Sequence, residues 1–232
     1  MRPQPTHPAA GTRQRRFVVG ITGASGAAYA LRLQELLLDQ GHEVHLVVSD
    51  YGRRLLADEA GVKHLDLDSL LPHMLGDTRP ALGLRPRAGE PWDAGEVGRR
   101  LVVHPNRDVG AVIASGSFLH DGMAVVPCSS ASLGAIATGS GSNLLARAAM
   151  VTLKERRRLI LCHRETPLSL IDIENMRTLT LAGAVVCPTN PGLYLAPKGV
   201  EDLVDFIAGK VLDLLGVEQG LATRWEPAGG GV

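Results

Sequence analysis

Short apolar runs alternate with segments of helical periodicity along most of the chain. The runs are rich in Val and Ile and show no polar alternation, which is typical of strands buried on both faces of a parallel sheet. They are Phe17–Ile21, Val44–Val48, Val109–Ala114, Met123–Val126, Leu159–Cys162 and Ala184–Cys187. Helical spacing of apolar residues occurs in Ala27–Gln40, Asn143–Arg158, Pro167–Leu181 and Val200–Leu215. This alternation predicts a single α/β domain with a doubly wound (Rossmann-like, flavodoxin-like) parallel sheet in three layers.

Three segments do not follow this pattern. Residues 1–16 are rich in Pro and Arg and contain no apolar core, so they predict a disordered N-terminal tail rather than a signal peptide. Residues 76–100 show no periodicity and predict an insertion loop within a folded domain of residues 17–216. Residues 217–232 contain few large apolar side chains and predict a C-terminal tail that carries Trp225.

The amino-acid composition gives no support for nucleic acid or a membrane as the partner. Among 232 residues, 24 Lys and Arg balance 24 Asp and Glu, so no charge excess favours nucleic acid or an anionic membrane. No apolar run approaches the roughly 18 residues of a membrane span. The three cysteines, Cys128, Cys162 and Cys187, stand inside apolar runs without metal-ligand spacing. They predict buried free thiols that pack in the core of a cytoplasmic protein, and no metal site is expected.

A glycine-rich turn follows the first predicted strand. The stretch GITGASG, from Gly20 to Gly26, is typical of a strand that turns tightly into a helix and directs backbone N–H groups at an anion. Its spacing is G-x-x-G-x-x-G, which is neither the dinucleotide fingerprint G-x-G-x-x-G nor a P-loop. Such a turn also occurs where glycine serves only close packing.

Polar residues follow the other predicted strands. In open α/β sheets, ligands bind beyond the carboxyl ends of the strands, so these residues are expected to share one edge. Small hydroxyl residues dominate there, and Arg164 adds a fork-shaped positive charge that suits a phosphorylated cofactor with a flat polar head. The segments are Ser49, Ser115–Ser117, Cys128–Ser132, His163–Glu165 and Thr189–Pro191.

Several long motifs resemble the UbiX family of flavin prenyltransferases. They are GITGASG, IASGSFLHDGMAVVPCSSASLGAIATG, NLLARAAMVTLKERR, HRETPLSLIDIENM and PGLYLAPKGVEDLVDFIAGKVLDLLG, and the resemblance runs from about Phe17 to Trp225. It implies binding of reduced FMN and transfer of a dimethylallyl group from dimethylallyl phosphate to flavin N5 and C6. The product, prenylated FMN, would serve a partner decarboxylase of the UbiD type. The family also implies a large homo-oligomer, possibly a dodecamer, with sites at subunit junctions.

The resemblance assigns roles to individual residues. The FMN positions are Gly23, Ala24, Ser25, Ser49, Ser129, Ser130, Ala131, Ser132 and Arg164, with Trp225 covering the flavin. The prenyl phosphate corresponds to Tyr194, Lys210, Arg147 and Lys154. Lys154 would neutralise the leaving phosphate, and proton transfer would use Glu165, or Glu59 with Ser25, or the released phosphate. Arg147 and Lys154 stand seven residues apart on one helix, so both can point to one side, and Arg147 may act across a subunit interface.

Plainer roles remain open for four of these residues. Lys154 belongs to a basic run, Glu165 could be a salt-bridged surface carboxylate, Glu59 could be a charge at a helix end, and Trp225 could be a packing plug.

Three other functions compete with this interpretation. An FMN-dependent cysteine decarboxylase of the same fold would use a His near the second strand, where this chain has Ser49-Asp50-Tyr51. A flavin-storage protein would need neither Lys154 nor Glu165. A short-chain dehydrogenase is suggested by Thr22-Gly23-Ala24-Ser25, but a Tyr-x-x-x-Lys pair is missing after the fourth strand.

Overall fold

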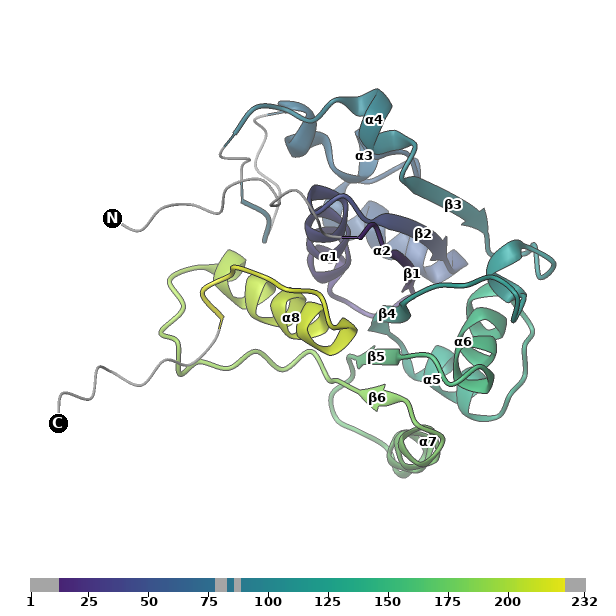
Figure 1. Cartoon of the computed structure of the whole chain (residues 1–232). Helices are drawn as coiled ribbons and strands as arrows, with labels where there is room; N and C mark the ends of the chain where they lie inside the picture. The colour runs from purple at the N-terminus through teal and green to yellow at the C-terminus, as the bar shows by residue number, and fades with distance from the viewer. Residues whose placement is uncertain (1–12, 78–82, 86–88, 224–232) are drawn as a thin grey trace, which may run out of the picture.

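Six parallel strands form the centre of the protein (Figure 1). The computed structural model describes residues 13–77, 83–85 and 89–223. The strands are β1 (Arg16–Ile21), β2 (Glu43–Val48), β3 (Leu101–Pro105), β4 (Gly122–Cys128), β5 (Leu159–His163) and β6 (Val185–Val186), in the order β3-β2-β1-β4-β5-β6. Every pair of neighbouring strands is parallel. The predicted doubly wound parallel sheet is confirmed.

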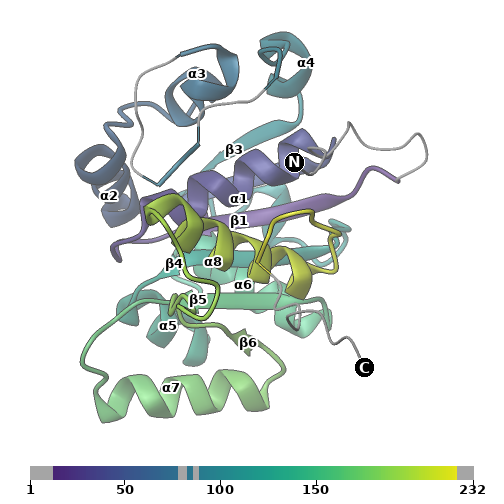
Figure 2. The same cartoon turned by 90° about the vertical axis from the view of Figure 1, so that its left-hand side faces the viewer.

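Helices cover both faces of this sheet. On one face α1 (Ala27–Asp39) and α8 (Val200–Leu215) lie side by side (Figure 2). On the other face α5 (Ser130–Ala137) and α6 (Leu144–Lys154) pack on the strands, and α7 (Leu170–Leu181) packs against α5 near β6. The remaining elements are α2 (Asp50–Ala60), α3 (Leu67–Leu70), η1 (Pro72–Leu75), α4 (Ala94–Gly98) and η2 (Val112–Ala114). No helix in the described part of the chain is long and apolar enough to cross a membrane.

The strand sequence explains the three layers. Successive side chains of a strand point to opposite faces, so β1 supplies both cores. Phe17, Val19 and Ile21 pack under α1 and α8, whereas Val18 packs under α5 and α6. A side chain at Gly20 would lie 3.2 Å from Leu145 of α6, so glycine allows that helix to approach the sheet.

The prediction of a strand at Val109–Ala114 was wrong. The third strand along the chain is Leu101–Pro105, and Val112–Ala114 forms the 3-10 turn η2. Ile113 alone is buried against the α5 and α6 core, while Val109 and Val112 are 42% and 54% exposed. A short apolar run does not distinguish a strand from a single helical turn.

The predicted segment boundaries differ in detail from the structure. Arg16 already belongs to β1, and the Arg15 guanidinium donates to the carbonyls of Leu215 and Gly216, so the ordered chain begins before residue 17. Within residues 76–100, α4 is a short helix rather than loop, and residues 78–82 and 86–88 are outside the described residues. Val217 is buried against the α1 and α8 core, so the folded domain extends past residue 216.

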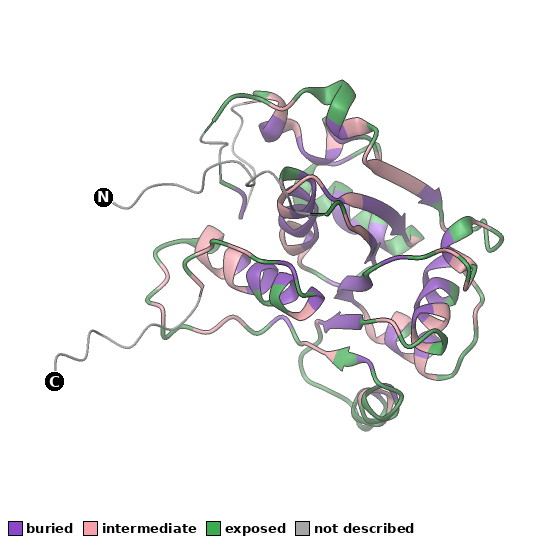
Figure 3. Ribbon diagram, in the orientation of Figure 1, coloured by how far each residue is buried: buried purple, intermediate pink, exposed green. Residues whose placement is uncertain are grey.

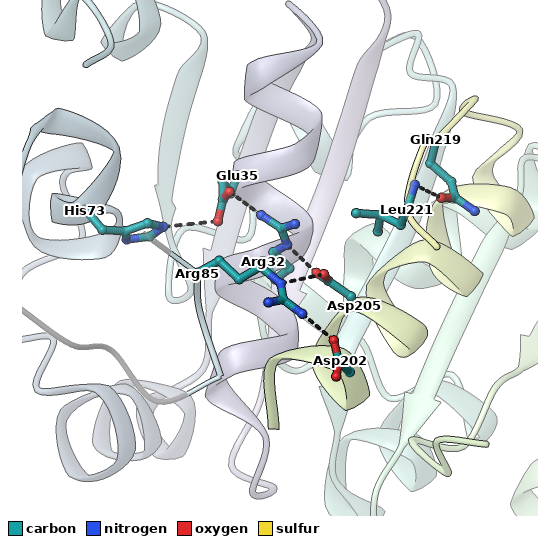
Figure 4. Close-up of polar contacts among 8 residues, drawn as sticks. All are labelled: Arg32, Glu35, His73, Arg85, Asp202, Asp205, Gln219 and Leu221. Carbon is teal, nitrogen blue, oxygen red and sulfur yellow. Dashed lines mark hydrogen bonds and ion pairs between the residues drawn. The ribbon is translucent and has the colours of Figure 1, made fainter. Parts of the chain in front are cut away.

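A buried ion network connects α1 with its neighbours (Figure 4). Arg32 on α1 is 8% exposed, and its Nε donates to Asp205 Oδ1 of α8 at 2.7 Å. Arg32 also pairs with Glu35 one turn along the helix. The second oxygen of Glu35 lies 3.1 Å from His73 Nε2 of η1. Arg85 reaches the outer side of Asp205, at 3.3 Å, and thereby ties the segment 83–85 to α8.

Removing one partner of this network should destabilise the fold strongly. Glu35→Ala leaves the Arg32 guanidinium buried with one carboxylate fewer, and breaking a buried pair costs about 3–5 kcal/mol. Asp58→Ala is the matched control, because Asp58 and its partner Arg54 have side chains 66% and 78% exposed and such pairs contribute about 0–1 kcal/mol. The measurement is the free energy of unfolding in urea. Equal losses in the two variants would contradict a structural role for the network.

Candidate active site at the carboxyl edge of the sheet

The turns after β1 and β4 are joined by one hydroxyl group. Thr22 is fully buried, and its backbone N–H and Oγ1 both donate to the carbonyl of Pro127, at 3.2 and 2.8 Å. The same Oγ1 accepts a hydrogen bond from Ser129 N at 2.8 Å. The strand order reverses between β1 and β4, where ligands of open α/β sheets bind. The predicted Gly23–Ser25 and Ser129–Ser132 segments therefore lie side by side at this crevice.

The glycine-rich turn holds an anion, and that anion belongs to the chain itself. The carboxylate of Glu59, from α2, accepts hydrogen bonds from the N–H groups of Gly26 and Ala27 at 2.9 Å each. Burial raises the pKa of Glu59, but hydrogen bonds from the Ser25 hydroxyl and from these two N–H groups outweigh it, so the pKa is lowered. Glu59 and Ser25, predicted as a pair from distant parts of the sequence, are in contact.

Close approach of α2 explains one glycine of this turn. A side chain at Gly23 would come within 2.3 Å of Cβ of Tyr51, so any larger residue would push the turn and α2 apart. The Tyr51 side chain itself is 76% exposed beside the turn. Sequence reasoning missed Tyr51, because nothing in its local pattern distinguishes it from a surface residue.

Serines cap two further helices at the same edge. Ser49 Oγ accepts from Gly52 N at the start of α2, and Ser129 Oγ accepts from Ser132 N at the start of α5. The N–H groups of Ser130 and Ala131 stand in the first turn of α5, where a helix provides no internal acceptor. The start of α5 can therefore bind an anion, whereas the start of α1 is occupied by Glu59.

Arg164 supplies positive charge next to these turns. Its backbone N–H donates to Cys128 O at 3.2 Å, which places it after β5 beside the α5 turn. Its Nε is buried and lacks a hydrogen-bond partner among the described residues. The positive charge of Arg164 contributes to the lowered pKa of Glu59, so Arg164 faces the α1 turn. Burial raises the pKa of Tyr29, and the charge of Arg164 only partly opposes this effect. A partly buried arginine whose Nε lacks a partner fits an anionic ligand such as FMN.

Glu165 and Ser130 have contacts of their own. Glu165 is exposed, and its Oε1 accepts from the neighbouring Thr166 N at 3.0 Å. Ser130 faces Asp172, the buried capping residue of α7, and the hydroxyls of Ser130 and Ser169 lower the pKa of Asp172 to about 2. Asp172 therefore stays ionised and fixes the start of α7 against α5. The S-x-x-D spacing of a capping box was the signal that could have identified it.

Tyr194 packs on Phe206 of α8, the helix that also carries the exposed Lys210. The ring of Tyr194, which is 61% exposed, packs on Phe206 with centroids 5.9 Å apart. Phe206 and Lys210 are four residues apart on α8 and therefore neighbours on its surface. The assignment of Tyr194 and Lys210 to the prenyl phosphate stays a prediction, and the ring contact with Phe206 places Tyr194 one helical turn from Lys210.

Arg147 and Lys154 do not complete the site within one chain. Lys154 ends α6, and only Glu155–Arg158 separate it from the first residue of β5, so it lies at the amino edge of the sheet. The five residues of β5 then span about 16 Å to Arg164 at the other edge. Lys154 Nζ lies 2.9 Å from Glu155 Oε1, and the Ser115–Ser117 segment packs beside it. Placing that segment among the ligand-edge residues was therefore wrong, because the strand expected before it does not form.

Two further points concern the predicted site residues. Arg147 is exposed near the start of α6, two turns from Lys154 and closer to the carboxyl edge. Trp225 lies outside the described residues.

Removing the Glu59 carboxylate should reduce the loss of folding stability that occurs as the pH falls. We expect Glu59→Ala to lower the free energy of unfolding by about 1 kcal/mol at pH 7, the usual effect of an N-terminal helix cap. Because the folded protein lowers the pKa of Glu59, this contribution is present above its ordinary value of 4.5 and is lost as the pH falls through the folded value. Chemical denaturation between pH 7 and pH 3, with Asp58→Ala as control, measures it. A deficit that stays constant with pH would contradict the assignment.

Comparison with known proteins agrees with this arrangement. The model of the Flavoprotein family matches residues 6–212. The flavin prenyltransferase UbiX of Halalkalibacterium halodurans is 41% identical over 209 residues, which cover 90% of this chain and 92% of the relative.

Solved structures show the same similarity. A crystal structure of AnUbiX (PadA1) in complex with FMN and dimethylallyl pyrophosphate is 36% identical, with a TM-score of 0.70, and the match covers 92% of this chain and all of the other. A dodecameric FMN-dependent UbiX-like decarboxylase from Escherichia coli O157:H7 is 34% identical, with a TM-score of 0.72, and the match covers 91% and 99% of the two chains. The chain belongs to the UbiX family of flavin prenyltransferases within the Flavoprotein family.

Proposed function

We propose that this protein transfers a dimethylallyl group from dimethylallyl phosphate to N5 and C6 of reduced FMN. The product is prenylated FMN, and its recipient is a decarboxylase of the UbiD type. The observation that carries the proposal is the contact of Ser25 with Glu59 beside the unpaired guanidinium of Arg164, at the sheet crevice. The similarity to flavin prenyltransferases, one of them bound to FMN and a prenyl pyrophosphate, supports the same reaction.

FMN is held by backbone N–H groups, hydroxyls and one arginine that line the crevice. The phosphate binds at the start of α5, where the N–H groups and hydroxyls of Ser129–Ser132 converge, together with Ser49 at the start of α2. Arg164 adds the balancing positive charge. Gly23 and Ala24 present backbone without bulk, which allows a flat ring to approach.

Different charged residues of the chain assist the departure of the phosphate and the proton transfer. Bound reduced FMN supplies the electron-rich N5 and C6 atoms. Lys154, Arg147 and Lys210 neutralise the charge of the departing phosphate, which stabilises cleavage of the allylic C–O bond without a metal ion, and the Tyr194 hydroxyl binds the same phosphate. Glu59, whose pKa is lowered, is ionised at neutral pH and accepts a proton through Ser25, while Glu165 is the second carboxylate available for proton transfer.

The site is completed by a second copy of the chain. Lys154 lies at the opposite edge of its own sheet, about one strand length from Arg164, so it reaches the flavin edge of a neighbouring subunit. Helix α7 is largely exposed (Figure 3), and apolar side chains on and around it offer the contact for such an assembly. They are Leu168, Leu170, Ile171, Ile173, Leu181 and Val185, which are 40–74% exposed. The dodecameric relative from Escherichia coli supports a homo-oligomer.

Arg164→Ala should weaken FMN binding by about 1.5–3 kcal/mol, because it removes charge-assisted hydrogen bonds to the cofactor. Arg99→Ala, in an exposed position after α4, is the matched control. Titration of the apoprotein with FMN, followed by flavin fluorescence, measures the affinity. Unchanged affinity in Arg164→Ala would remove this residue from the FMN site.

Mixed oligomers test whether Lys154 acts across subunits. Lys154→Ala should bind FMN normally but form no flavin adduct, and Arg164→Ala should be inactive at FMN concentrations that saturate only the wild type. Random assembly of equal amounts leaves about one quarter of junction sites with both residues intact, so the mixture should regain about one quarter of wild-type activity.

The readout is the mass and absorbance of flavin released after incubation with reduced FMN and dimethylallyl phosphate, with the diphosphate in a parallel arm. A mixture no more active than its parents would show that Lys154 serves its own subunit or has no role. A wild type that binds FMN but alkylates it with neither donor would refute the proposed reaction.

A further inference from the structure

Two cysteines stand at neighbouring positions on the last two strands of the sheet. The register pairs Ile160 with Val185 and Leu161 with Val186, and Cys187 N donates to Leu161 O at 2.9 Å. Cys162 and Cys187 are therefore the next pair, and residues paired in register point to the same face of a sheet. Adjacent parallel strands lie about 4.8 Å apart, within the Cα separation of roughly 4.4–6.8 Å that a disulfide requires.

The two thiols differ in their access to solvent. Both pack into the core under α1 and α8. Cys162 is 0% exposed, whereas Cys187 is only partly buried, beside the short edge strand β6. A small reagent from solvent can therefore reach Cys187 first, and Cys162 only through it.

Their surroundings also make the two thiols chemically different. The Cys162 thiol hydrogen-bonds to Cys187 and, against the effect of burial and with the help of Lys210 on α8, lowers the pKa of Cys187 to about 7. Cys187 is therefore more readily ionised near neutral pH than an unperturbed thiol. The same contact raises the pKa of Cys162, and burial raises the pKa of Cys128 to about 12, so both stay protonated.

We propose that Cys187 and Cys162 form an oxidisable pair in which Cys187 is attacked by a peroxide and Cys162 then closes an intramolecular disulfide. The Cys187 thiolate attacks hydrogen peroxide, the O–O bond breaks, and a sulfenic acid and hydroxide form, the latter taking up a proton to give water. The Cys162 sulfur then attacks the sulfenic sulfur, and a second water leaves with the Cys162 proton. Two thiols are oxidised by two electrons and one peroxide is reduced to two waters.

Oxidation of this pair changes the charge beside a residue of the donor site. Lys210, assigned to the prenyl phosphate under the proposed function, faces a partly ionised thiol in the reduced protein and a neutral disulfide in the oxidised one. The existence of the pair, however, does not depend on the transferase reaction, because mass alone reveals the disulfide.

The test uses the full chain, fully reduced, freed of reductant and treated with one equivalent of hydrogen peroxide at pH 7. We expect the intact mass to fall by two hydrogens and peptide mapping to link Cys162 to Cys187. Cys128→Ser should behave like the wild type. Cys162→Ala should instead accumulate a sulfenic acid on Cys187 that dimedone traps, and Cys187→Ala should leave Cys162 unmodified. Thermal unfolding confirms that each variant is folded.

A second measurement examines the thiolate directly. Alkylation of Cys187 by iodoacetamide, followed against pH, should show an inflection near pH 7 that moves upward in Cys162→Ala, because the hydrogen-bond donor is lost. Three results would overturn the proposal: no mass loss in the wild type, a link that involves Cys128 or a second chain, or an inflection that Cys162→Ala leaves unchanged.

Discussion

The arrangement of the crevice depends on the buried hydroxyl of Thr22. This hydroxyl donates to the carbonyl of Pro127 near the end of β4 and accepts from the N–H of Ser129, so it joins the two turns that border the reversal of strand order. A side chain without both a donor and an acceptor would leave a buried polar group unpaired, at a cost of about 1–3 kcal/mol. Since α1 begins after one turn and α5 after the other, this single group sets the relative position of their two N-termini.

The two helix N-termini differ in the groups that lie next to them. Glu59 fills the start of α1, so the positive end of that helix stabilises a carboxylate of the chain and no longer attracts a ligand. Among the described residues, only serines of the same turn cap the backbone N–H groups at the start of α5. Arg164 lies beside this turn, and its Nε lacks a hydrogen-bond partner there. A phosphorylated ligand is therefore directed to α5, while the α1 turn is left to present a carboxylate and the Ser25 hydroxyl. Under the proposed function, the glycine-rich turn would serve proton transfer more than phosphate binding.

Strands that are marked by a continuous run of buried apolar residues could be predicted from the sequence. Features that depend on contacts between residues far apart in the chain could not. Strands such as β1 and β4 are buried on both faces, and their continuous apolar runs identify them. The edge strand β3 follows two arginines and buries only His104, so its pattern is weak, and a nearby apolar turn was mistaken for it. At the site, the serines and Arg164 were identified as candidates because ligands of open α/β sheets bind beyond the carboxyl ends of the strands. The cap formed by Glu59 joins residues more than 30 positions apart, and only the resemblance to a family indicated it.

Under the proposed function, the position of Lys154 makes assembly part of the active site. Within one chain the flavin groups and this lysine occupy opposite edges of the sheet, and a rigid strand separates them. A single chain can therefore bind an anionic flavin at α5 and Arg164, yet it lacks part of the positive charge that a departing phosphate requires. Only when α6 of one copy meets the crevice of another do both sets of charges surround one site. If the apolar surface on and around α7 forms that contact, as proposed above, substitutions there should affect turnover without touching any ligand.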